Sequence, residues 1–433
     1  MADREEEYYW RRLDNAAKIF PAISNRLSPN VFRLTVKLRC EIDKEILQGV
    51  VEQALEDMPS FKVKLRRGLF WYYFEKNFSR PQVKEENAFP CRRIDKFSDN
   101  GFLFRVIYFH KKISLEVFHV LTDGAGASCF LSHIVFLYLK AAFPGEEMGE
   151  ERPVPLSDSP LALDEDSFQK YQQMGSGVVK PPFEKAYHVD GVRVFGAELK
   201  VVQGVFSASQ AAALAKAKGV TVTAYFAALL LYSIDLESFR YHEKKQPVSV
   251  CVPVNLRNFY QTDTLRNFFT TIGISADFYS REYSFDDLLA EASRQLKEGL
   301  SPEVLADKIK YSVRAEKNLA LRFVPLFLKN FALKMIYRKG EQAHSVTLSN
   351  LGRISFPPQA ASHIDRCEFL LSATKSQGLK TSMVSTGDVM VYSFTSNLEE
   401  MQVAKRFFRT LVAEGVPVTI VSNEREELKD EDL

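Results

Sequence analysis

Residues 102–143 constrain the fold more than any other stretch, because two different hydrophobic periods meet within it. The run FLFRVIYFHKKISLEVFHV (102–120) alternates in polarity and predicts a β-hairpin that turns near Lys111 and Lys112. The next run, AGASCFLSHIVFLYLKAAF (125–143), is apolar on nearly every face and predicts a buried helix. Paired strands followed at once by a buried helix indicate a sheet with helical cover.

Strand-like and helix-like stretches alternate along the rest of the chain. In the first half the pattern predicts a strand at 30–42, a helix at 43–59 and a hairpin at 62–77 that turns at Gly68. In the second half it predicts, in order, a strand from 201, a helix from Ser207 with Gln210 in a capping box and Gly219 at its end, a helix at 221–236, a strand at 247–257, a helical region at 285–338, strands at 343–352, 367–376 and 381–396, and a helix at 398–415. The fold class is therefore α/β with mixed (α+β) sheets.

A change of composition divides the chain. Residues 145–200 are rich in proline, serine and acidic residues and show no lasting period, which is typical of a linker or crossover segment. A chain of 433 residues is also too long for one ordinary core. We therefore expect an N-terminal domain over 1–180 and a C-terminal domain over 201–433.

The charge balance argues against nucleic acid as a partner. The net charge is +2, with 57 lysines and arginines against 55 acidic residues. A nucleic-acid-binding domain usually carries a strongly basic face. The basic cluster KVKLRRG (62–68) lies among strand-like residues and is interpreted as a solvated sheet face.

The cysteines and the apolar segments bear on compartment and membrane. Five scattered cysteines show no metal-ligand spacing, so we expect no metal site and a reduced, cytoplasmic protein. The first 15 residues lack the apolar stretch of a signal peptide. The run FVPLFLKNFALKMIY (323–337) carries Lys329 and Lys334 and is too short to span a bilayer, so a buried amphipathic helix is expected.

His119 is the candidate functional residue of the first half. It has the same strand parity as Ile113, Leu115 and Val117, so it should face the same interior. Asp123 follows four residues later, immediately before a glycine and the long helix. Each residue also has a structural interpretation, since a histidine can be satisfied within a core and an aspartate can cap a helix.

Competing catalytic motifs are absent from the sequence. It contains no GxSxG, no HExxH and no GxxxxGK[ST]. The run GAGAS (124–128) begins like a dinucleotide-binding loop but lacks the third glycine.

The run HVLTDG (119–124) resembles the HxxxDG motif of the chloramphenicol-acetyltransferase-like superfamily, which includes acyltransferases and the condensation domains of peptide synthetases. Three further runs fit in order: LDNAAKIFPA (13–22) is similar to the opening of bacterial alcohol acetyltransferases, PVNLR (253–257) to a strand-end motif, and TLSNLGRI (347–354) to a strand near the active-site tunnel. The resemblance extends from about residue 10 to 415.

Three differences from the family's motifs limit which members of the superfamily this sequence resembles. Phe118 stands where condensation domains usually carry a second histidine, and the DFGWG of the plant enzymes is absent. The run RNFF (266–269) stands where many relatives show Gly-Asn-Phe. A stand-alone bacterial acyltransferase is the nearest match.

The resemblance implies two similar domains with the active-site channel between them and His119 at its middle. Asp123 would form an ion pair with Arg257 rather than orient the histidine, and Gly124 would keep the channel open. Ser349 and Asn350 are candidate oxyanion donors, although SNLG is equally typical of a turn. Asn255 would support the site or simply end its strand.

The implied activity is transfer of an acyl group, acetyl above all, from acyl-CoA to the hydroxyl or amine of a small acceptor. His119 would act as general base without a covalent acyl-enzyme. Acyl-CoA would be a co-substrate, no cofactor would be bound, and the protein would be a monomer. The alternatives are a condensation-like synthase that takes acyl groups from a carrier protein, and a non-catalytic binding protein.

Overall fold

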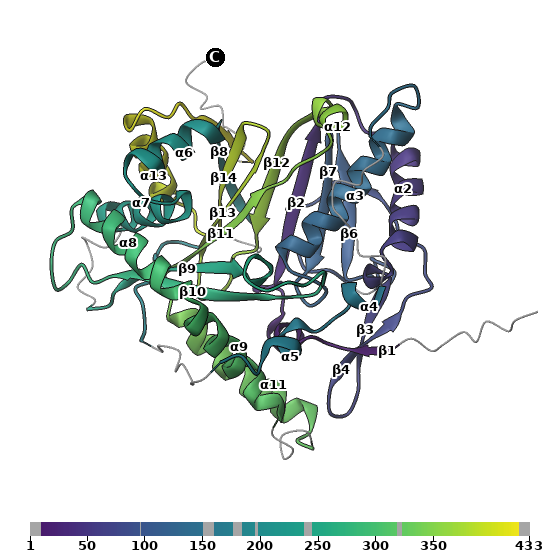
Figure 1. The fold of residues 1–433 in the computed structure, drawn as a ribbon, viewed down its shortest axis with the longest axis horizontal. Coiled ribbons are helices and arrows are strands. Elements are labelled where there is room, and N and C mark those ends of the chain that lie inside the picture. Colours follow the sequence, from purple (N-terminus) through teal and green to yellow (C-terminus); the bar gives the residue numbers. More distant parts are fainter. Residues whose placement is uncertain are drawn as a thin grey trace, which may run out of the picture.

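The computed structural model describes residues 10–95, 97–149, 160–175, 184–194, 198–237, 245–317 and 323–423. Within these ranges the chain forms a five-stranded sheet, a seven-stranded sheet and a small three-stranded sheet. The two large sheets lie next to each other, with helices on their outer sides (Figure 1).

The five-stranded sheet is built mainly from the first half of the chain. Its order is β12-β2-β7-β6-β5. The bounds are Ile364–Leu371 for β12, Val31–Leu38 for β2, Lys112–Phe118 for β7, Phe104–Phe109 for β6 and Lys84–Glu85 for β5. Helices α2 (Lys44–Asp57) and α3 (Gly124–Ala142) cover one of its faces (Figure 1).

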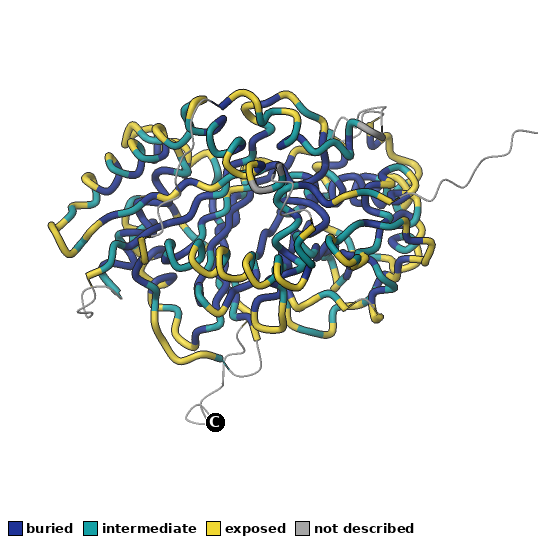
Figure 2. The backbone as a smooth tube through the Cα atoms, turned by 90° about the horizontal axis from the view of Figure 1, so that it is seen from below, coloured by how far each residue is buried: buried dark blue, intermediate teal, exposed yellow. Residues whose placement is uncertain are grey.

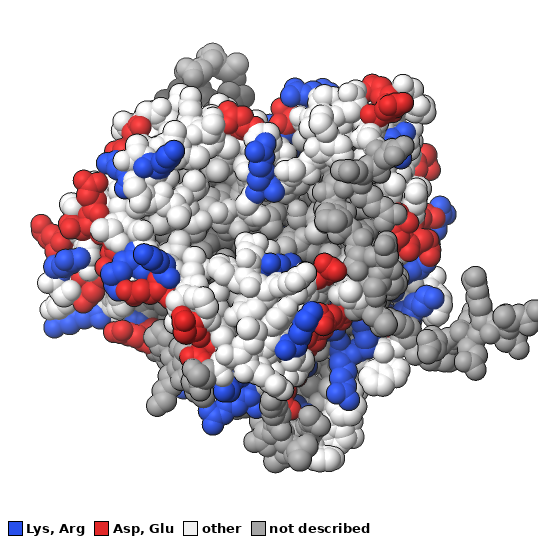
Figure 3. Space-filling model, viewed as in Figure 1, with Lys and Arg blue, Asp and Glu red and all other residues white. Residues whose placement is uncertain are grey.

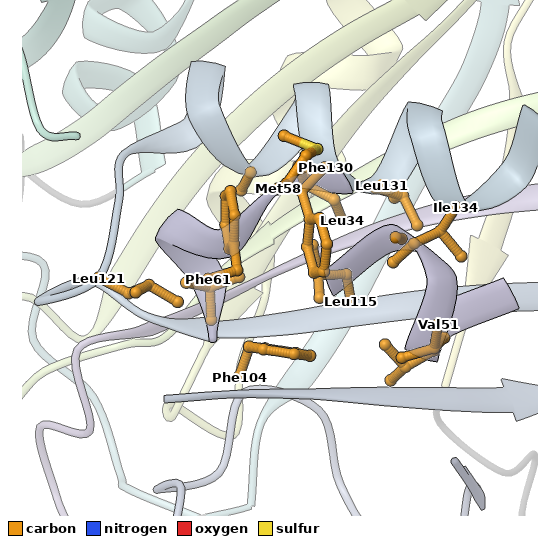
Figure 4. Packing of buried hydrophobic residues seen from close by; sticks show 14 of the residues in the cluster. Leu34, Val51, Met58, Phe61, Phe104, Leu115, Leu121, Phe130, Leu131 and Ile134 are labelled. Carbon is orange, nitrogen blue, oxygen red and sulfur yellow. The ribbon is translucent and has the colours of Figure 1, made fainter. Parts of the chain in front are cut away.

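The core beneath these two helices is rich in aromatic rings. Phe61 stacks on Phe130 of α3 with ring centroids 4.1 Å apart, and Phe104 of β6 packs edge-on against Phe130 at 5.2 Å. Figure 4 shows these rings between the helices and the strands, beside Leu34 and Leu115. The alternating strand and the apolar helix that the sequence predicts thus meet in one core.

The seven-stranded sheet comes from the second half of the chain, in the order β10-β9-β11-β13-β14-β8-β15. The bounds are Lys200–Ser207 for β8, Val248–Asn255 for β9, Phe269–Ala276 for β10, Val346–Arg353 for β11, Leu379–Thr386 for β13, Val389–Ser396 for β14 and Thr419–Ser422 for β15. The helices on its outer side are α6 (Ala208–Ala217), α7 (Val222–Glu237), α8 (Phe285–Gly299) and α13 (Gln402–Ala413).

Strand β12 joins the two large sheets. It belongs to the second half of the sequence, yet it pairs antiparallel with β2, with Cys367 opposite Val36. The two expected domains therefore share strands, and a division near residue 200 does not separate the sheets.

The remaining elements lie around these sheets. The small sheet contains β1 (Trp10–Arg12), β3 (Val63–Arg67) and β4 (Tyr72–Lys76). The other helices are η1 (Ala16–Ile19), α1 (Phe20–Ile23), η2 (Pro59–Phe61), α4 (Pro160–Leu163), α5 (Ser167–Tyr171), η5 (Leu256–Asn258), α9 (Pro302–Lys317), α11 (Leu326–Gln342) and α12 (Pro358–Ser362).

Some local predictions differ from the structure in register. The hairpin of β6 and β7 turns at His110 and Lys111, and His110 adopts the left-handed conformation with φ of 48°. Strand β12 begins three residues earlier than the predicted 367–376 run, and β10 was not predicted. Ser207 caps α6 by accepting a hydrogen bond from the Gln210 N–H at 3.2 Å, which is one half of the expected capping box.

The expectation that 323–337 forms a buried helix is wrong. The segment includes most of α11, but Phe323, Phe327 and Phe331 are 75%, 63% and 68% exposed. Only one edge of the helix faces the protein, through Leu326, Leu333 and Tyr337. Figure 2 looks from below at the end where α9 and α11 lie, and exposed residues dominate the helix turns there.

Two apolar helical stretches meet the length and composition of a membrane span. They are α3, whose mean hydropathy reaches 1.4, and the α6–α7 pair, which bends by 82°. Helix α3 packs against β2, β7 and α2, and 61% of its apolar window is buried. Its apolar character is accounted for by the protein core.

Candidate active site

His119 lies just beyond the end of β7, in the turn that leads into α3. Its backbone N–H donates to the Asn30 carbonyl at 2.9 Å, which fixes the turn beside the start of β2. The imidazole is half-buried and lines a cavity of about 190 Å³ between the two large sheets. The strand parity thus directs His119 toward the interior, where it meets open space.

The hydrogen bonds of Asn267 determine which nitrogen of His119 is free. Asn267 Nδ2 donates to the Asp14 carboxylate at 3.3 Å, so its Oδ1 is the atom that faces His119. His119 Nδ1 lies 3.0 Å from this Oδ1, and a carbonyl oxygen can only accept. Nδ1 therefore carries the proton, and Nε2 keeps a lone pair.

A buried carboxylate supports this arrangement. Asp14 also accepts a hydrogen bond from the Ala17 N–H at 2.7 Å, and Arg266 Nε lies 3.6 Å from its Oδ2. Burial raises the pKa of the Asp14 carboxyl, and the positive charge of Arg266 offsets part of that rise. Asp14 lies in the LDNAAKIFPA run, so that run contributes to the site through a hydrogen bond rather than through the fold alone.

Aromatic rings surround the imidazole. Phe20 of α1 stacks on it with centroids 4.4 Å apart, and Phe32 and Phe269 approach at 5.1 and 5.4 Å. Burial lowers the pKa of His119 below its usual 6.5, although Asp123 and Asn267 act in the opposite direction. The ring is therefore neutral at neutral pH, as a general base must be.

Asp123 turns away from His119 and caps α3. One carboxylate oxygen accepts from the Gly126 N–H at 3.1 Å. The other accepts from the Phe268 N–H and from Arg257 Nη1, both at 2.8 Å. Asp123 thus links the turn that carries His119 to the loop between η5 and β10.

Arg257 is held by several further acceptors. Its Nε donates to the Thr264 carbonyl at 2.8 Å, and its Nη2 donates to the Arg266 carbonyl. Asn255 Oδ1 accepts both from Arg257 Nη1 and from the Arg257 N–H, each at 3.1 Å. Asn255 therefore caps η5 and orients the guanidinium, while it also lines the cavity.

Two glycines at the start of α3 allow close approach. A Cβ on Gly124 would lie 3.0 Å from Leu351 Cδ1 and 3.9 Å from Phe369 Cζ, and both of these side chains line the cavity. A Cβ on Gly126 would overlap Thr122 Oγ1 and the Leu265 carbonyl. The sequence analysis singled out Gly124 only, because the loop that crosses Gly126 comes from far along the chain.

The two oxyanion candidates differ in surroundings. Thr347, Ser349 and Leu351 alternate along β11 and line the cavity. Within the described ranges Ser349 Oγ has no hydrogen-bond partner, so it can donate to a ligand. Asn350 is exposed at the rim, where its Nδ2 donates to Thr223 Oγ1 at 2.9 Å and its Oδ1 accepts from the Gly352 N–H at 2.8 Å.

A lysine that the sequence analysis did not select also lines the cavity. Lys380 reaches it from β13. Burial lowers the pKa of its ammonium, while Glu341 and Cys251 oppose the shift. No sequence motif marks this lysine, because its position depends on the pairing of β13 with β11.

A larger, basic cavity of about 620 Å³ adjoins the first one, and Ser372 lines both. Its cationic lining residues are Arg26, Arg92, Arg93, Arg193 and Lys375. These residues come from four separate segments of the chain. No single basic run in the sequence therefore predicted a basic cavity. Within the described residues no group of histidine, cysteine and carboxylate side chains could hold a metal ion.

No protein-family model and no curated protein matches this chain. Many solved structures match over nearly its whole length. Among them are polyketide synthase associated protein 5 of Mycobacterium tuberculosis (TM-score 0.62, 15% identity, 94% of this chain and 97% of that one), trichothecene 15-O-acetyltransferase of Fusarium sporotrichioides (0.55, 12%, 94% and 94%), and the starter condensation domain of rhizomide synthetase in complex with C8-CoA and Leu-SNAC (0.57, 12%, 93% and 94%).

These likenesses establish the fold. The chain has the two-domain, mixed α/β fold that is shared by chloramphenicol-acetyltransferase-like acyltransferases and condensation domains. The resemblance predicted from HVLTDG is thereby confirmed at the level of the fold. The neighbours include an acetyltransferase and a condensation domain.

Proposed function

We propose that this protein transfers an acyl group, acetyl above all, from acyl-CoA to the hydroxyl or amine of a small acceptor. The observation that carries the proposal is the hydrogen bond between His119 Nδ1 and Asn267 Oδ1, at 3.0 Å. It leaves a lone pair on Nε2 of a neutral ring that lines the cavity, which is what a general base for an alcohol or amine requires.

The reaction needs one base and no acyl-enzyme. His119 Nε2 takes the proton of the acceptor as its oxygen or nitrogen attacks the thioester carbonyl. The tetrahedral oxyanion then collapses and the carbon–sulfur bond breaks. The CoA thiolate that leaves takes the acceptor's proton from Nε2, which returns His119 to its neutral form. Within the described residues no serine or cysteine is hydrogen-bonded to His119, which disfavours a covalent relay.

Ser349 is the better of the two candidate oxyanion donors. Its hydroxyl lines the cavity without another partner, whereas the Asn350 amide is occupied by Thr223 and Gly352. Lys380 would add positive charge to the same cavity. A single donor of this kind contributes roughly 10²–10³-fold to the rate.

The basic cavity suits the phosphates of the acyl donor. Arg92 and Arg93 are exposed on its wall, and the cavity adjoins the space around His119 at Ser372. Arginine guanidinium groups bind phosphate in a bidentate manner. We assign this cavity to the 3′-phosphate and pyrophosphate of CoA, which would direct the thioester toward His119.

Thiol release from acetyl-CoA and longer acyl-CoAs, with a panel of alcohols and amines, tests the proposal. Acceptor-dependent release should fall by about 10²–10⁴-fold in His119→Ala. His363→Ala is the matched control, because His363 pairs with Glu146 on the surface. Equal rates in wild type and His119→Ala would refute the assignment of the base.

The donor site has its own test. Arg92→Gln with Arg93→Gln should raise KM for acetyl-CoA about tenfold and leave KM for an acetyl N-acetylcysteamine thioester unchanged, because that thioester has no phosphates. Arg409→Gln on α13 is the exposed control. An equal effect on both donors would argue against phosphate binding in this cavity.

The second candidate is a condensation-like synthase with a carrier-protein donor. The same basic cavity favours it, since a phosphopantetheine arm also carries phosphate. Absence of turnover with every acyl-CoA, together with turnover of an acylated carrier protein, would select this alternative.

A further inference from the structure

Helix α11 and the tip of the β3–β4 hairpin form one apolar surface. The Leu326 N–H donates to the Leu69 carbonyl at 3.0 Å, and Lys329 Nζ donates to the Phe70 carbonyl at 2.9 Å. These bonds hold the start of the helix against the hairpin tip. We call the exposed side chains of Leu69, Trp71, Phe323, Phe327 and Phe331 the apolar end surface.

The apolar side chains of this surface are more than half exposed to solvent. Leu69 is 72% exposed and Trp71 is 51% exposed, in addition to the three phenylalanines. Phe327 and Phe331 are four residues apart and therefore share the outward side of α11. Contiguous exposed apolar side chains of this kind mark an interaction site.

The charges on α11 up to Gly340 have one sign, and Glu75 on the hairpin is paired with Lys64 and Arg66. Helix α11 contains no acidic residue from Leu326 to Gly340, while Lys334, Arg338 and Lys339 are exposed along it. Arg67 is exposed beside the hairpin tip. Figure 3 shows lysine and arginine side chains at this lower end of the molecule, together with a few acidic ones.

We propose that the apolar end surface docks the protein on an anionic lipid bilayer, with the aromatic side chains in the headgroup region and the cations on lipid phosphates. Phenylalanines beside lysine and arginine on α11, next to Trp71 and Leu69 of the hairpin tip, give this surface the composition of a membrane-interface site. A second copy of the chain is disfavoured, because its lysines and arginines would face those of the first.

The inner edge of α11 connects this surface to the candidate site. The helix packs against α1, and Phe20 of α1 stacks on His119. Leu333 and Tyr337 pack on the same hydrophobic core as the His119 turn. A docked protein would hold its reaction cavity close to the lipid surface.

Co-sedimentation of the full-length protein with vesicles tests the proposal. Vesicles of phosphatidylcholine and phosphatidylglycerol in equal parts should bind the protein, and pure phosphatidylcholine vesicles should bind it more weakly. The double variant Phe327→Glu, Phe331→Glu should reduce vesicle binding by about tenfold or more. Lys334→Gln with Arg338→Gln and Lys339→Gln should reduce it by roughly 10²-fold at low salt, with a smaller difference at high salt.

Val412→Glu is the matched control, because Val412 is 50% exposed on α13 in the other half of the molecule. Its binding should equal that of the wild type, and thermal melting should show all variants folded. No binding of the wild type to the anionic vesicles would overturn the proposal. So would a dimer in light scattering that Phe327→Glu with Phe331→Glu dissociates.

The docking result is separable from the catalytic one. Turnover of a water-soluble acceptor should be unchanged in the Phe327→Glu, Phe331→Glu variant, because neither side chain lines the cavity. If this variant loses vesicle binding but keeps turnover, the surface serves docking and not catalysis. If it stays folded but loses turnover, docking and catalysis are not separate functions of these residues.

Discussion

Helices α3 and α11 both carry several large apolar side chains, but α3 is apolar along nearly its whole length, whereas α11 also carries Lys329, Lys334, Arg338 and Lys339. Helix α3 is buried along most of its length, with Phe130, Leu131, Ile134 and Leu139 in the core. Helix α11 buries Leu326 and leaves its phenylalanines in solvent. The difference lies in what the rest of the chain supplies, since α3 has a sheet and α2 on its sides, whereas α11 has a neighbour along one edge only.

The two helices also meet the candidate site differently. Helix α3 begins at Asp123, whose carboxylate is fully engaged by Gly126, Phe268 and Arg257. Helix α11 contacts the site indirectly, through α1 and Phe20 and through Glu341, which acts on Lys380 in the cavity. We therefore expect changes at the start of α3 to disturb fold and activity together, and changes on the outer side of α11 to disturb neither.

The largest effect is expected at the cap of α3. Asp123→Ala leaves the Arg257 guanidinium without its carboxylate and should cost about 3–5 kcal/mol of unfolding free energy. Urea denaturation would measure it. Asp123→Asn should retain part of the hydrogen bonding and cost less. Full stability in Asp123→Ala would show that the ion pair does not hold the turn.

Truncation within the buried helix should come next. Phe130→Ala removes a ring that stacks on Phe61 and packs on Phe104, and it should cost about 3–4 kcal/mol. Thermal and urea unfolding would both report it. A loss below about 1 kcal/mol would mean that the α3 core repacks around the cavity.

Asn267→Ala should leave the fold intact and impair the base. Without Asn267 the His119 proton is no longer fixed on Nδ1, so kcat should fall by about 10²-fold while KM changes little. The pKa of His119 should fall further, because the Asn267 hydrogen bond raises it. A kcat–pH profile distinguishes this effect from partial unfolding. Loss of the Asn267 hydrogen bond shifts the acid limb to lower pH, whereas unfolding lowers kcat at every pH.

The pH profile of the wild type should show one acid limb. His119 must be neutral to act, so activity falls as pH falls through its pKa, which burial places below 6.5. The rate should therefore rise along this limb at acid pH and reach a plateau on the alkaline side of it, until another group titrates. A limb centred above pH 6.5 would contradict an apolar surrounding for the imidazole.

The smallest effect is expected on the exposed side of α11. Phe331→Ser should change the unfolding free energy by less than about 0.5 kcal/mol, because that side chain contacts mainly solvent. Urea denaturation would measure the unfolding free energy of Phe331→Ser and of Phe130→Ala under the same conditions. A loss as large as that of Phe130→Ala would remove the contrast between the two helices.

The sequence predicted local elements well where a single period dominates. The predicted hairpin at 102–120 and helix at 125–143 correspond to β6 with β7 and to α3, and the turn before α3 carries the proposed base. The Asp123–Arg257 pair was expected from the family resemblance and is present at 2.8 Å, although its role in catalysis stays a prediction.

The rest depended on contacts between distant segments. Asn267 and Asp14 lie more than 250 residues apart in sequence, and neither carries a spacing signal that links it to His119. Lys380 reaches the cavity through strand pairing. Exposure of α11 could not be predicted either, because an amphipathic pattern specifies two faces but not which neighbours will cover them.

Strand β12 has a consequence for the order in which the chain can be assembled. It supplies the neighbour of β2, yet residues 364–371 are synthesised long after the first-half strands β2, β6 and β7. During translation, therefore, the early sheet has an open edge at β2 until most of the polypeptide has left the ribosome. That interval exposes a strand that could pair with another nascent chain. A fragment ending near residue 200 should aggregate rather than fold, and its partner half should not rescue it after release.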